Sequence, residues 1–330
     1  MVDDQTDDDA SAAPLSMLPA STPAQRTLRI ATLNVHGWHN EEGGSWQSLL
    51  KLLCTREGGP PDVLALQEAT KHRVPDLAHA LGDYHWIAWR NCAILSKLPI
   101  GASMPGMFSG RGLGASAGSG RKHLSTSNKQ GKHTCQMRHC AGVVTCADGT
   151  LIEIVCLHLD HVREPTRLGQ LRTLVEELND RPHMPALAQR VLLGDFNALT
   201  RSDYSPSEWT QIANIRANNA WEAPVSEITD VMVRRPTKKA PLGLQMHDAW
   251  ASVHPSKRIG PRSTCRFDTR IDYIFTTPRL AQALVGVECA VAIPHASDHN
   301  LVIAAFDLAT QHKVGEPSET VNVTMVNKRQ

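Results

Sequence analysis

The chain has 330 residues, of which 41% are hydrophobic and 20% are charged, with a formal net charge of +1. This composition is typical of a globular protein and excludes a fibrous or largely disordered chain. The near-zero charge excludes a global pull toward nucleic acid or membranes, so any such attraction must be local. The length allows one large domain or two small ones with a sizeable core.

The eight cysteines are scattered and form no C-x-x-C pair, which indicates reduced thiols rather than a disulfide framework. The first ten residues are acidic where a secretory signal carries basic residues, and no segment approaches the roughly 18 apolar residues of a membrane span. We therefore expect a cytosolic or nuclear protein.

Residues 1–26 are acidic and then rich in Ala, Ser and Pro, and residues 309–330 are polar, so we expect unpacked tails around a domain at 27–308. Apolar runs typical of strands recur at 28–35, 62–68, 85–96, 140–146, 150–159, 190–196, 270–275 and 301–308. Helical periodicity occurs at 45–57 and 167–180, and a capping box at 205–208 begins a third helix. This pattern predicts an α/β protein of packed sheets with outer helices.

Residues 101–140 depart from this pattern because they are rich in Gly and Ser and hold six Lys and Arg residues but no acid. We interpret the segment as a flexible basic insertion between two strands. Charge runs are usually only solvated, so a passive loop is the alternative. The histidines and cysteines within it lack the paired spacing of small zinc sites.

Polar side chains stand where many of the predicted strands begin or end. They are Asn34, Glu68, His158, Asp195, Asn197, Asp272, Asp298 and His299. In open α/β sheets, strand ends from distant segments converge on one cleft. Carboxylate and amide oxygens are the ligands that Mg²⁺ or Mn²⁺ requires, and the histidines can bind phosphate or move protons.

The ordered motifs NVHG, QE, HLD, GDFN, RIDY and SDHN resemble those of the endonuclease/exonuclease/phosphatase superfamily. That group includes deoxyribonuclease I, apurinic endonucleases, tyrosyl-DNA phosphodiesterases, deadenylases, neutral sphingomyelinases and inositol polyphosphate phosphatases. The resemblance covers nearly all of residues 27–308. It implies a four-layer α/β sandwich and hydrolysis of a phosphoester with a bound divalent cation, Mg²⁺ or Mn²⁺.

The resemblance also implies a role for each motif residue. Glu68 would bind the metal, with Asn34 in support and Asp298 on the metal side through water. The catalytic group would comprise His158 and His299 at the phosphate, Asp195 and Asn197 at the attacking water and a phosphate oxygen, and Asp272 as the partner of His299. A neighbouring carboxylate would hold His299 in one tautomer and favour its protonated form. Asp195 and the Asp272–His299 pair both remain candidates for the group that takes the proton.

Two features distinguish the chain from the apurinic endonucleases. His36 stands where those enzymes carry an Asp, and the HLDH segment replaces a motif that contains Tyr. In HLDH, strand alternation would direct His158 and His161 to opposite faces, so they would not chelate one zinc ion. Arg167 and Gln170, three apart on the following helix, could hold the segment or serve as ordinary surface residues.

We expect a monomer that hydrolyses a phosphodiester, with DNA or RNA among the candidate substrates. One alternative is a phosphatase or sphingomyelinase-like hydrolase of small or lipid phosphates. Another is a non-catalytic binding protein, which the presence of every motif residue disfavours.

Overall fold

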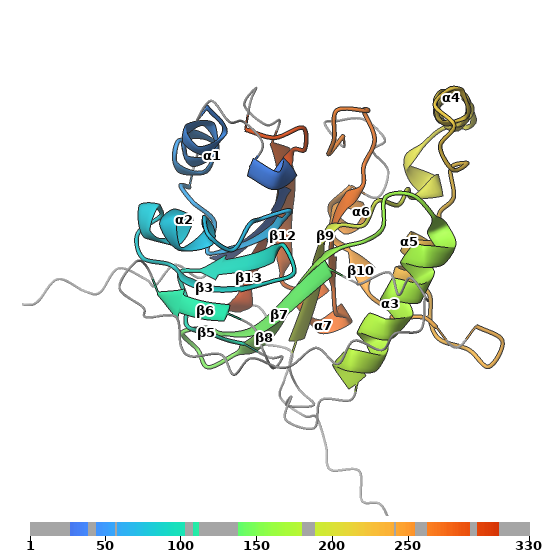
Figure 1. Cartoon of the computed structure of the whole chain (residues 1–330). Helices are drawn as coiled ribbons and strands as arrows, with labels where there is room; N and C mark the ends of the chain where they lie inside the picture. The colour runs from blue at the N-terminus through green and yellow to red at the C-terminus, as the bar shows by residue number, and fades with distance from the viewer. Residues whose placement is uncertain are drawn as a thin grey trace, which may run out of the picture.

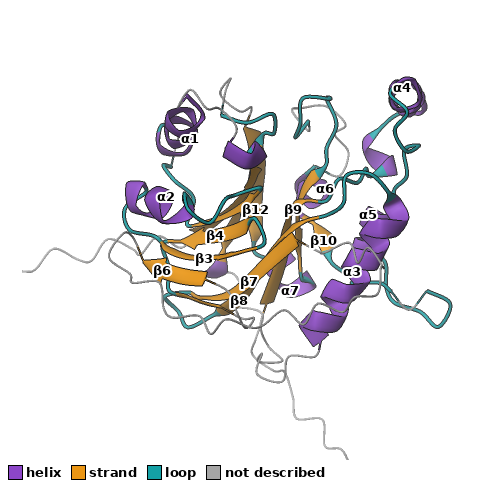
Figure 2. Ribbon diagram, viewed as in Figure 1, coloured by secondary structure: helices purple, strands orange, loops and turns teal. Residues whose placement is uncertain are grey.

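The computed structural model describes residues 27–38, 44–56, 58–102, 108–111, 138–179, 189–240, 242–254, 263–290 and 296–309. This part of the chain contains a seven-stranded and a six-stranded sheet, packed face to face (Figure 1). Helices cover the outer side of each sheet, as Figure 2 shows in purple and orange. None of the helices in these ranges is long and apolar enough to cross a membrane.

The strand order of each sheet places early and late segments side by side. The first sheet has the order β12 (Leu284–Ala290), β13 (Leu301–Asp307), β1 (Thr27–Asn34), β2 (Val63–Gln67), β4 (Cys92–Ser96), β3 (His85–Trp89) and β6 (Phe108–Arg111). The second has the order β10 (His247–Asp248), β11 (Asp272–Thr276), β9 (Gln189–Asp195), β8 (Leu151–His158), β7 (Arg138–Thr145) and β5 (Ile100–Ala102). Each sheet is mixed, with β1 parallel to β2 and β8 parallel to β9.

Three apolar clusters define four layers. The central cluster lies between the sheets and includes Ile30, Ile94 and Ile154, which are fully buried. A second cluster packs α1 (Gly44–Cys54) and α2 (Val74–Ala80) on the first sheet. A third packs α3 (Glu164–Asn179) and α5 (Glu227–Val233) on the second sheet. Burying one large aliphatic side chain contributes about 1.5–3 kcal/mol, so these clusters hold the layers together.

The remaining helices are short or lie outside these layers. They are η1 (His36–Trp38), η2 (Arg201–Asp203), α4 (Pro206–Asn218), α6 (Ala249–Val253) and α7 (Pro278–Ala281). The capping box predicted for α4 is confirmed, because Ser205 Oγ accepts the Glu208 N–H and Glu208 Oε2 accepts the Ser205 N–H. The four-layer α/β sandwich implied by the motifs is likewise confirmed.

The single apolar run predicted at 85–96 is two strands. β3 and β4 pair as a hairpin whose turn residues, Arg90 and Asn91, have φ values of 47° and 63°. Two consecutive left-handed residues make the turn whose twist matches an antiparallel pair. Asn tolerates that conformation, but Arg gives no signal of it, so the turn was not visible in the sequence.

The predicted basic insertion at 101–140 includes residues that belong to strands. Residues 101–102 belong to β5, residues 108–111 form β6, and β7 begins at Arg138. The rest of that segment, residues 1–26 and residues 310–330 lie outside the described residues.

Candidate active site

The topology brings the ends of six strands to one edge of the molecule. The carboxyl ends of β1 and β2 share an edge because these strands are parallel, and the same holds for β8 and β9. β13 is antiparallel to β1, and β11 is antiparallel to β9, so each begins where its neighbour ends. These ends carry Asn34, Glu68, His158, Asp195, Asp272 and His299. The sheet pairing itself therefore assembles the predicted residues.

Gly194 explains why the apolar run of β9 stops just before an acid. Its φ is 139°, and a Cβ at this position would lie 2.0 Å from the carbonyl oxygen of Leu157 on β8. Only glycine permits such a close approach. Phe196 then turns into the outer core, where its ring meets those of Tyr273 and Phe275 at centroid distances of 5.5 and 5.1 Å. Asp195, between Gly194 and Phe196, is directed into the site.

Asp195 is the centre of the cluster and is only 2% exposed. Asn34 Nδ2 donates to Asp195 Oδ2 at 3.0 Å. The same oxygen lies 3.6 Å from His158 Nε2 and 3.9 Å from His299 Nε2. Glu68 Oε1 accepts from Asn34 Nδ2 at 3.3 Å and lies 4.0 Å from His158 Nε2. Residues from both sheets thus surround one carboxylate.

Strand alternation in the GDFN motif predicts that Asp195 and Asn197 share one strand face, and this prediction is wrong. β9 ends at Asp195, and Asn197 adopts a φ of 49° beyond it. Its backbone N–H donates to Asp195 Oδ1 at 2.9 Å, and its Nδ2 donates to the Leu159 carbonyl at 3.1 Å. A turn, rather than a shared strand face, places the Asn197 backbone against the Asp195 carboxylate.

Asp272 and His299 form a buried pair, as the motifs imply. His299 Nδ1 lies 2.9 Å from Asp272 Oδ2. Burial raises the pKa of Asp272 to about 6, against the pull of His299. Burial alone would lower the pKa of His299, but the carboxylates of Asp272 and Asp195 outweigh it and raise that pKa well above its ordinary value. The pair therefore favours a protonated imidazole at neutral pH.

Asp298 lies beside this cluster and differs in its partners. Its carboxylate is 3.3 Å from His36 Nδ1 and 3.6 Å from Arg266 Nε, and its buried Oδ1 has no hydrogen bond. The preceding Ser297 donates its Oγ to the Asn34 carbonyl at 2.6 Å and accepts the His299 N–H at 3.0 Å. Sequence reasoning missed Ser297, although it opens the SDHN motif.

The HLDH segment is held by the helix that follows it. β8 ends at His158, so Asp160 and His161 lie in a loop. Gln170 Oε1 accepts the Asp160 N–H at 2.8 Å, and Arg167 Nη1 donates to the Asp160 carbonyl at 3.0 Å. Arg167 is also paired with the buried Glu164 at 2.7 Å. Both side chains therefore position the segment rather than serve as surface residues.

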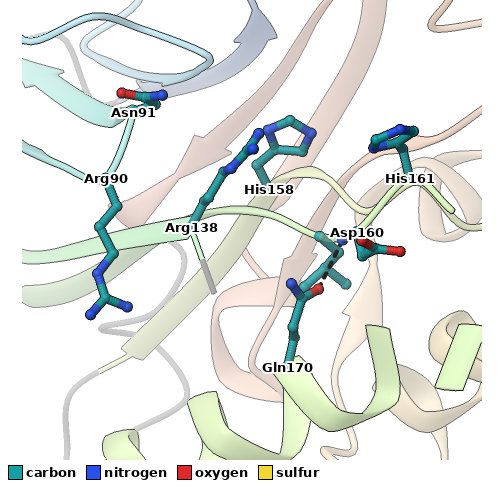
Figure 3. A pocket seen from close by; sticks show the side chains of 8 residues that line it. Arg90, Asn91, Arg138, His158, Asp160, His161 and Gln170 are labelled. Carbon is teal, nitrogen blue, oxygen red and sulfur yellow. Dashed lines mark hydrogen bonds between the residues drawn. The ribbon is translucent and has the colours of Figure 1, made fainter. Parts of the chain in front are cut away.

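A cavity of about 410 Å³ opens on one side of His158 (Figure 3). Its lining includes Arg90, Asn91, Arg138 and His161, and in Figure 3 the Arg138 side chain extends toward His158. His158 Nδ1 is buried and has no hydrogen-bond partner. The cavity thus combines cationic groups with an imidazole of the cluster, which suits a phosphate-bearing ligand.

Two groups of side chains could hold a metal ion. Ligand atoms of Asp195, Asp272 and His299 all lie within 4.8 Å of one another, and Asp272 Oδ1 is buried without a hydrogen bond. This buried group is consistent with a metal site. Glu68 and Asp298 offer further carboxylate oxygens with 29% and 22% of their side chains exposed. The donor set of the cluster therefore fits a divalent cation.

A four-layer α/β sandwich with acidic, amide and imidazole groups gathered at one edge of both sheets defines a phosphoesterase-type fold. The sequence profile of the Endonuclease/Exonuclease/phosphatase family matches residues 31–299. The chain belongs to this family. No curated protein matches its sequence closely enough to add a nearer relative.

Solved structures share the fold at low sequence identity. A 3′ phosphatase from Neisseria, solved with a product DNA hairpin, is 20% identical with a TM-score of 0.51, covering 85% of this chain and 99% of its own. A Beutenbergia cavernae endonuclease/exonuclease/phosphatase is 16% identical with a TM-score of 0.52, covering 86% and 72%. An AP endonuclease from Archaeoglobus fulgidus is 17% identical with a TM-score of 0.50, covering 85% and 100%. At these identities the likeness concerns the fold alone.

Proposed function

We propose that the chain is a divalent-metal-dependent phosphodiesterase that acts on nucleic acid or a related phosphodiester. The observation that carries the proposal is the convergence on Asp195 Oδ2 of one amide at 3.0 Å and two imidazoles at 3.6 and 3.9 Å. A buried carboxylate ringed by hydrogen-bond donors suits a water that attacks phosphorus in line with the leaving group.

Each residue of the cluster has a chemical task in this proposal. The carboxylates that raise the pKa of His299 favour its protonated form, which would donate to a phosphate oxygen. Asp195 is therefore our choice for the group that takes the proton of the attacking water. His158 would contact a second phosphate oxygen, and Asn197 would orient the phosphate. Asp272 positions His299 through the 2.9 Å contact.

We place the metal ion with Glu68, Asn34 and Asp298 rather than between Asp195, Asp272 and His299. An ion in the second position would compete with the Asp272–His299 contact. Mg²⁺ prefers oxygen ligands and keeps several of its waters, which suits the more exposed carboxylates of Glu68 and Asp298. A bound divalent cation supplies positive charge that stabilises negative charge on the phosphoryl oxygens.

Removal of the metal tests this assignment. EDTA should abolish hydrolysis, and added Mg²⁺ or Mn²⁺ should restore it. Glu68→Gln should raise the Mg²⁺ concentration needed for half-maximal activity, because a neutral amide binds the ion less strongly than a carboxylate. Full activity in chelator would contradict the metal dependence. An unchanged Mg²⁺ requirement in Glu68→Gln would contradict the placement of the ion at Glu68.

Two observations favour a nucleic-acid substrate. The cationic cavity beside His158 suits a polyanion whose neighbouring phosphates follow the reacting one. The structurally similar Neisseria enzyme was solved with DNA. Purified protein should be screened with Mg²⁺ against DNA, RNA, nucleotides, inositol phosphates and sphingomyelin. Preferential hydrolysis of inositol phosphates or sphingomyelin would instead support a small- or lipid-phosphate hydrolase.

Failure to hydrolyse any of these compounds would favour the non-catalytic alternative. The monomeric state and the cytosolic or nuclear placement stay predictions. The seven cysteines within the described residues form no disulfide.

A further inference from the structure

A second cavity adjoins the catalytic cluster, and its lining differs in chemistry from that of the cationic cavity beside His158. Its volume is about 460 Å³, and both Asn197 and His299 line it. The rest of its lining comes from α4, from residues 161–162, 220–222 and 265–271, and from Asp298, and it contains more apolar and aromatic than charged side chains. These residues include Val162, Ile212, Ile215, Trp221, Phe267 and Ile271.

The apolar lining of this cavity is exposed to an unusual degree. Seven large apolar side chains are exposed among the described residues, and four of them, Val162, Ile215, Trp221 and Phe267, line this cavity. Trp221 is 42% exposed and Phe267 is 46% exposed. Concentrated exposed apolar surface on a globular protein marks a binding site, whereas single exposed residues need no explanation.

Helix α4 supplies one wall and contributes little to the core. None of its residues is buried, and Ile212 and Ile215 face the cavity. Figure 1 shows the helix standing apart from the two sheets. Most helices in proteins owe their stability to packing an apolar face, and α4 lacks such packing in the described residues. Its apolar side chains are instead available to a ligand.

Trp221 and Phe267 form an aromatic pair at the cavity, although 46 positions separate them in sequence. Their ring centroids lie 5.1 Å apart at an interplanar angle of 78°. The Arg266 guanidinium lies 4.8 Å from the Phe267 centroid and 3.6 Å from Asp298. Because Arg266 lies over the Phe267 ring and the two rings are nearly perpendicular, a planar ligand can stack on the exposed Trp221 ring and meet Phe267 at its edge.

The position of Trp221 is fixed by its neighbour. Glu222 Oε1 accepts the Glu164 N–H at 2.7 Å, and its other oxygen pairs with Arg167. Arg216 Nε donates to the Glu222 carbonyl. These contacts tie the loop after α4 to the start of α3, so the aromatic surface stands at a defined place beside the catalytic cluster.

We propose that this cavity binds the aromatic base of the nucleotide whose phosphate is hydrolysed, by stacking it on Trp221 beside Phe267. The inference rests on the proposed function, because it takes the reacting phosphate to lie at Asn197 and His299. A base attached through one sugar to that phosphate reaches the adjoining cavity. Every base has a π-face, so the site accepts any base that fits and selects nucleotides over phosphates without a ring.

Binding of product-like phosphates tests the proposal without requiring turnover. Calorimetry with Mg²⁺ would compare thymidine 5′-monophosphate and thymidine 3′-monophosphate with the corresponding base-free deoxyribose phosphates and with hexyl phosphate. At least one thymidine isomer should bind roughly 5- to 100-fold more tightly than its base-free counterpart, the range expected for one stacked base.

Variants of the two aromatic residues test whether they cause the tighter binding of phosphates that carry a base. Trp221→Ala and Phe267→Ala should each remove most of the advantage of the base and leave the affinity for deoxyribose phosphate unchanged. Trp221→Phe should retain most of it. Val285→Ala, at an exposed apolar position on β12 outside the cavity, is the matched control and should change nothing.

The outcomes separate this inference from the proposed function. Equal affinities with and without the base, or no measurable binding of either nucleotide, would overturn the inference even in an active enzyme. Hexyl phosphate binding as tightly as the nucleotide, with equal loss in both alanine variants, would overturn it in favour of an aliphatic, lipid-type ligand. A base preference in a protein that hydrolyses no phosphodiester would support the cavity and contradict the proposed function.

Discussion

Asp195 and His299 lie in the same buried cluster but have different partners. Asp195 accepts hydrogen bonds from the Asn34 side chain and the Asn197 backbone. His299 faces two carboxylates that raise its pKa above its ordinary value. One group is thus suited to accept a proton and the other to donate a hydrogen bond to phosphate.

Replacing either residue should lower turnover far more than stability. We expect Asp195→Asn and His299→Ala each to reduce turnover by roughly 10²- to 10⁴-fold, the contribution of a positioned proton-transfer group. Steady-state kinetics with thermal unfolding would measure both effects. The exposed His79–Asp83 pair, 2.9 Å apart, provides matched controls, since Asp83→Asn and His79→Ala should leave turnover unchanged. A loss below tenfold in Asp195→Asn would remove Asp195 as the base.

The Asp272–His299 pair should act as one unit. If Asp272 serves only to position and charge His299, then Asp272→Asn should reproduce most of the loss seen in His299→Ala. The double variant should be little worse than the single ones, because groups that act together give non-additive losses. A double-mutant cycle on turnover measures this coupling. Losses that multiply would assign Asp272 a role independent of His299.

At the scale of the element, the sequence predicts the inner apolar strands well and misses the edge strands, of which β12 has seven residues. Strands buried on both faces appear in the sequence as continuous apolar runs, which is why five of them were predicted: β1, β2, β8, β9 and β13. β5 and β10 have only three and two residues, too few to show any period. Their place depends on pairing with distant strands, which local sequence does not encode.

The candidate site divides in the same way. Residues at strand ends were predictable, because topology makes strand ends converge, and the structure brings them together around Asp195. The second cavity was not predictable, because Trp221 and Phe267 lie in loops outside any motif. Their meeting at 5.1 Å depends on how those loops pack. Neither residue has a local pattern that marks it as part of a site.

Gly194 provides a test of how strand geometry supports the site. In Gly194→Ala the new Cβ would lie 2.0 Å from the Leu157 carbonyl oxygen, so β9 must move away from β8. We expect a loss of roughly 1–3 kcal/mol in the free energy of unfolding, typical of overpacking, together with reduced turnover because Asp195 moves with the strand. Chemical denaturation and kinetics measure the two effects.

Gly101→Ala is the control for this change. Gly101 lies on the edge strand β5, where a Cβ would meet nothing within 4 Å. Its substitution should leave stability within about 0.5 kcal/mol and turnover unchanged. Wild-type stability and activity in Gly194→Ala would show that β9 has more freedom than its contacts indicate.

At the scale of the whole molecule, the catalytic cluster lies between two cavities of different chemistry. The cavity beside His158 has Arg90 and Arg138 in its lining, whereas the cavity beside His299 has Trp221 and Phe267. A nucleic acid bears both kinds of group, since charged phosphates follow one another along the backbone while the bases project from it. Because the overall charge is only +1, the molecule as a whole attracts no polyanion, and binding of a nucleic acid would depend on such local features.

The basic residues between β6 and β7 provide the last test of substrate class. Because the ends of the 101–140 segment belong to strands, substitution is a safer change than deletion. Replacing Arg121, Lys122, Lys129 and Lys132 with Gln removes four positive charges in residues 112–137. If these side chains bind backbone phosphates, the plot of log affinity against log salt concentration should become less steep. Its slope should change by about 0.7–0.9 for each substitution.

The measurement is the Michaelis constant for a long DNA or RNA at several salt concentrations, beside a small chromogenic phosphodiester. The variant should show a higher Michaelis constant and a flatter salt dependence on the polymer, because fewer counterions are released when it binds. Hydrolysis of the small substrate should not change, since the substituted residues lie outside the catalytic motifs. Lys238→Gln with Lys239→Gln, at two exposed positions after α5, controls for a general change in charge. Equal salt slopes for the wild type and the four-residue variant would show that the segment is a passive insertion. The electrostatic argument for a nucleic-acid substrate would then rest on the cavity lined by Arg90 and Arg138.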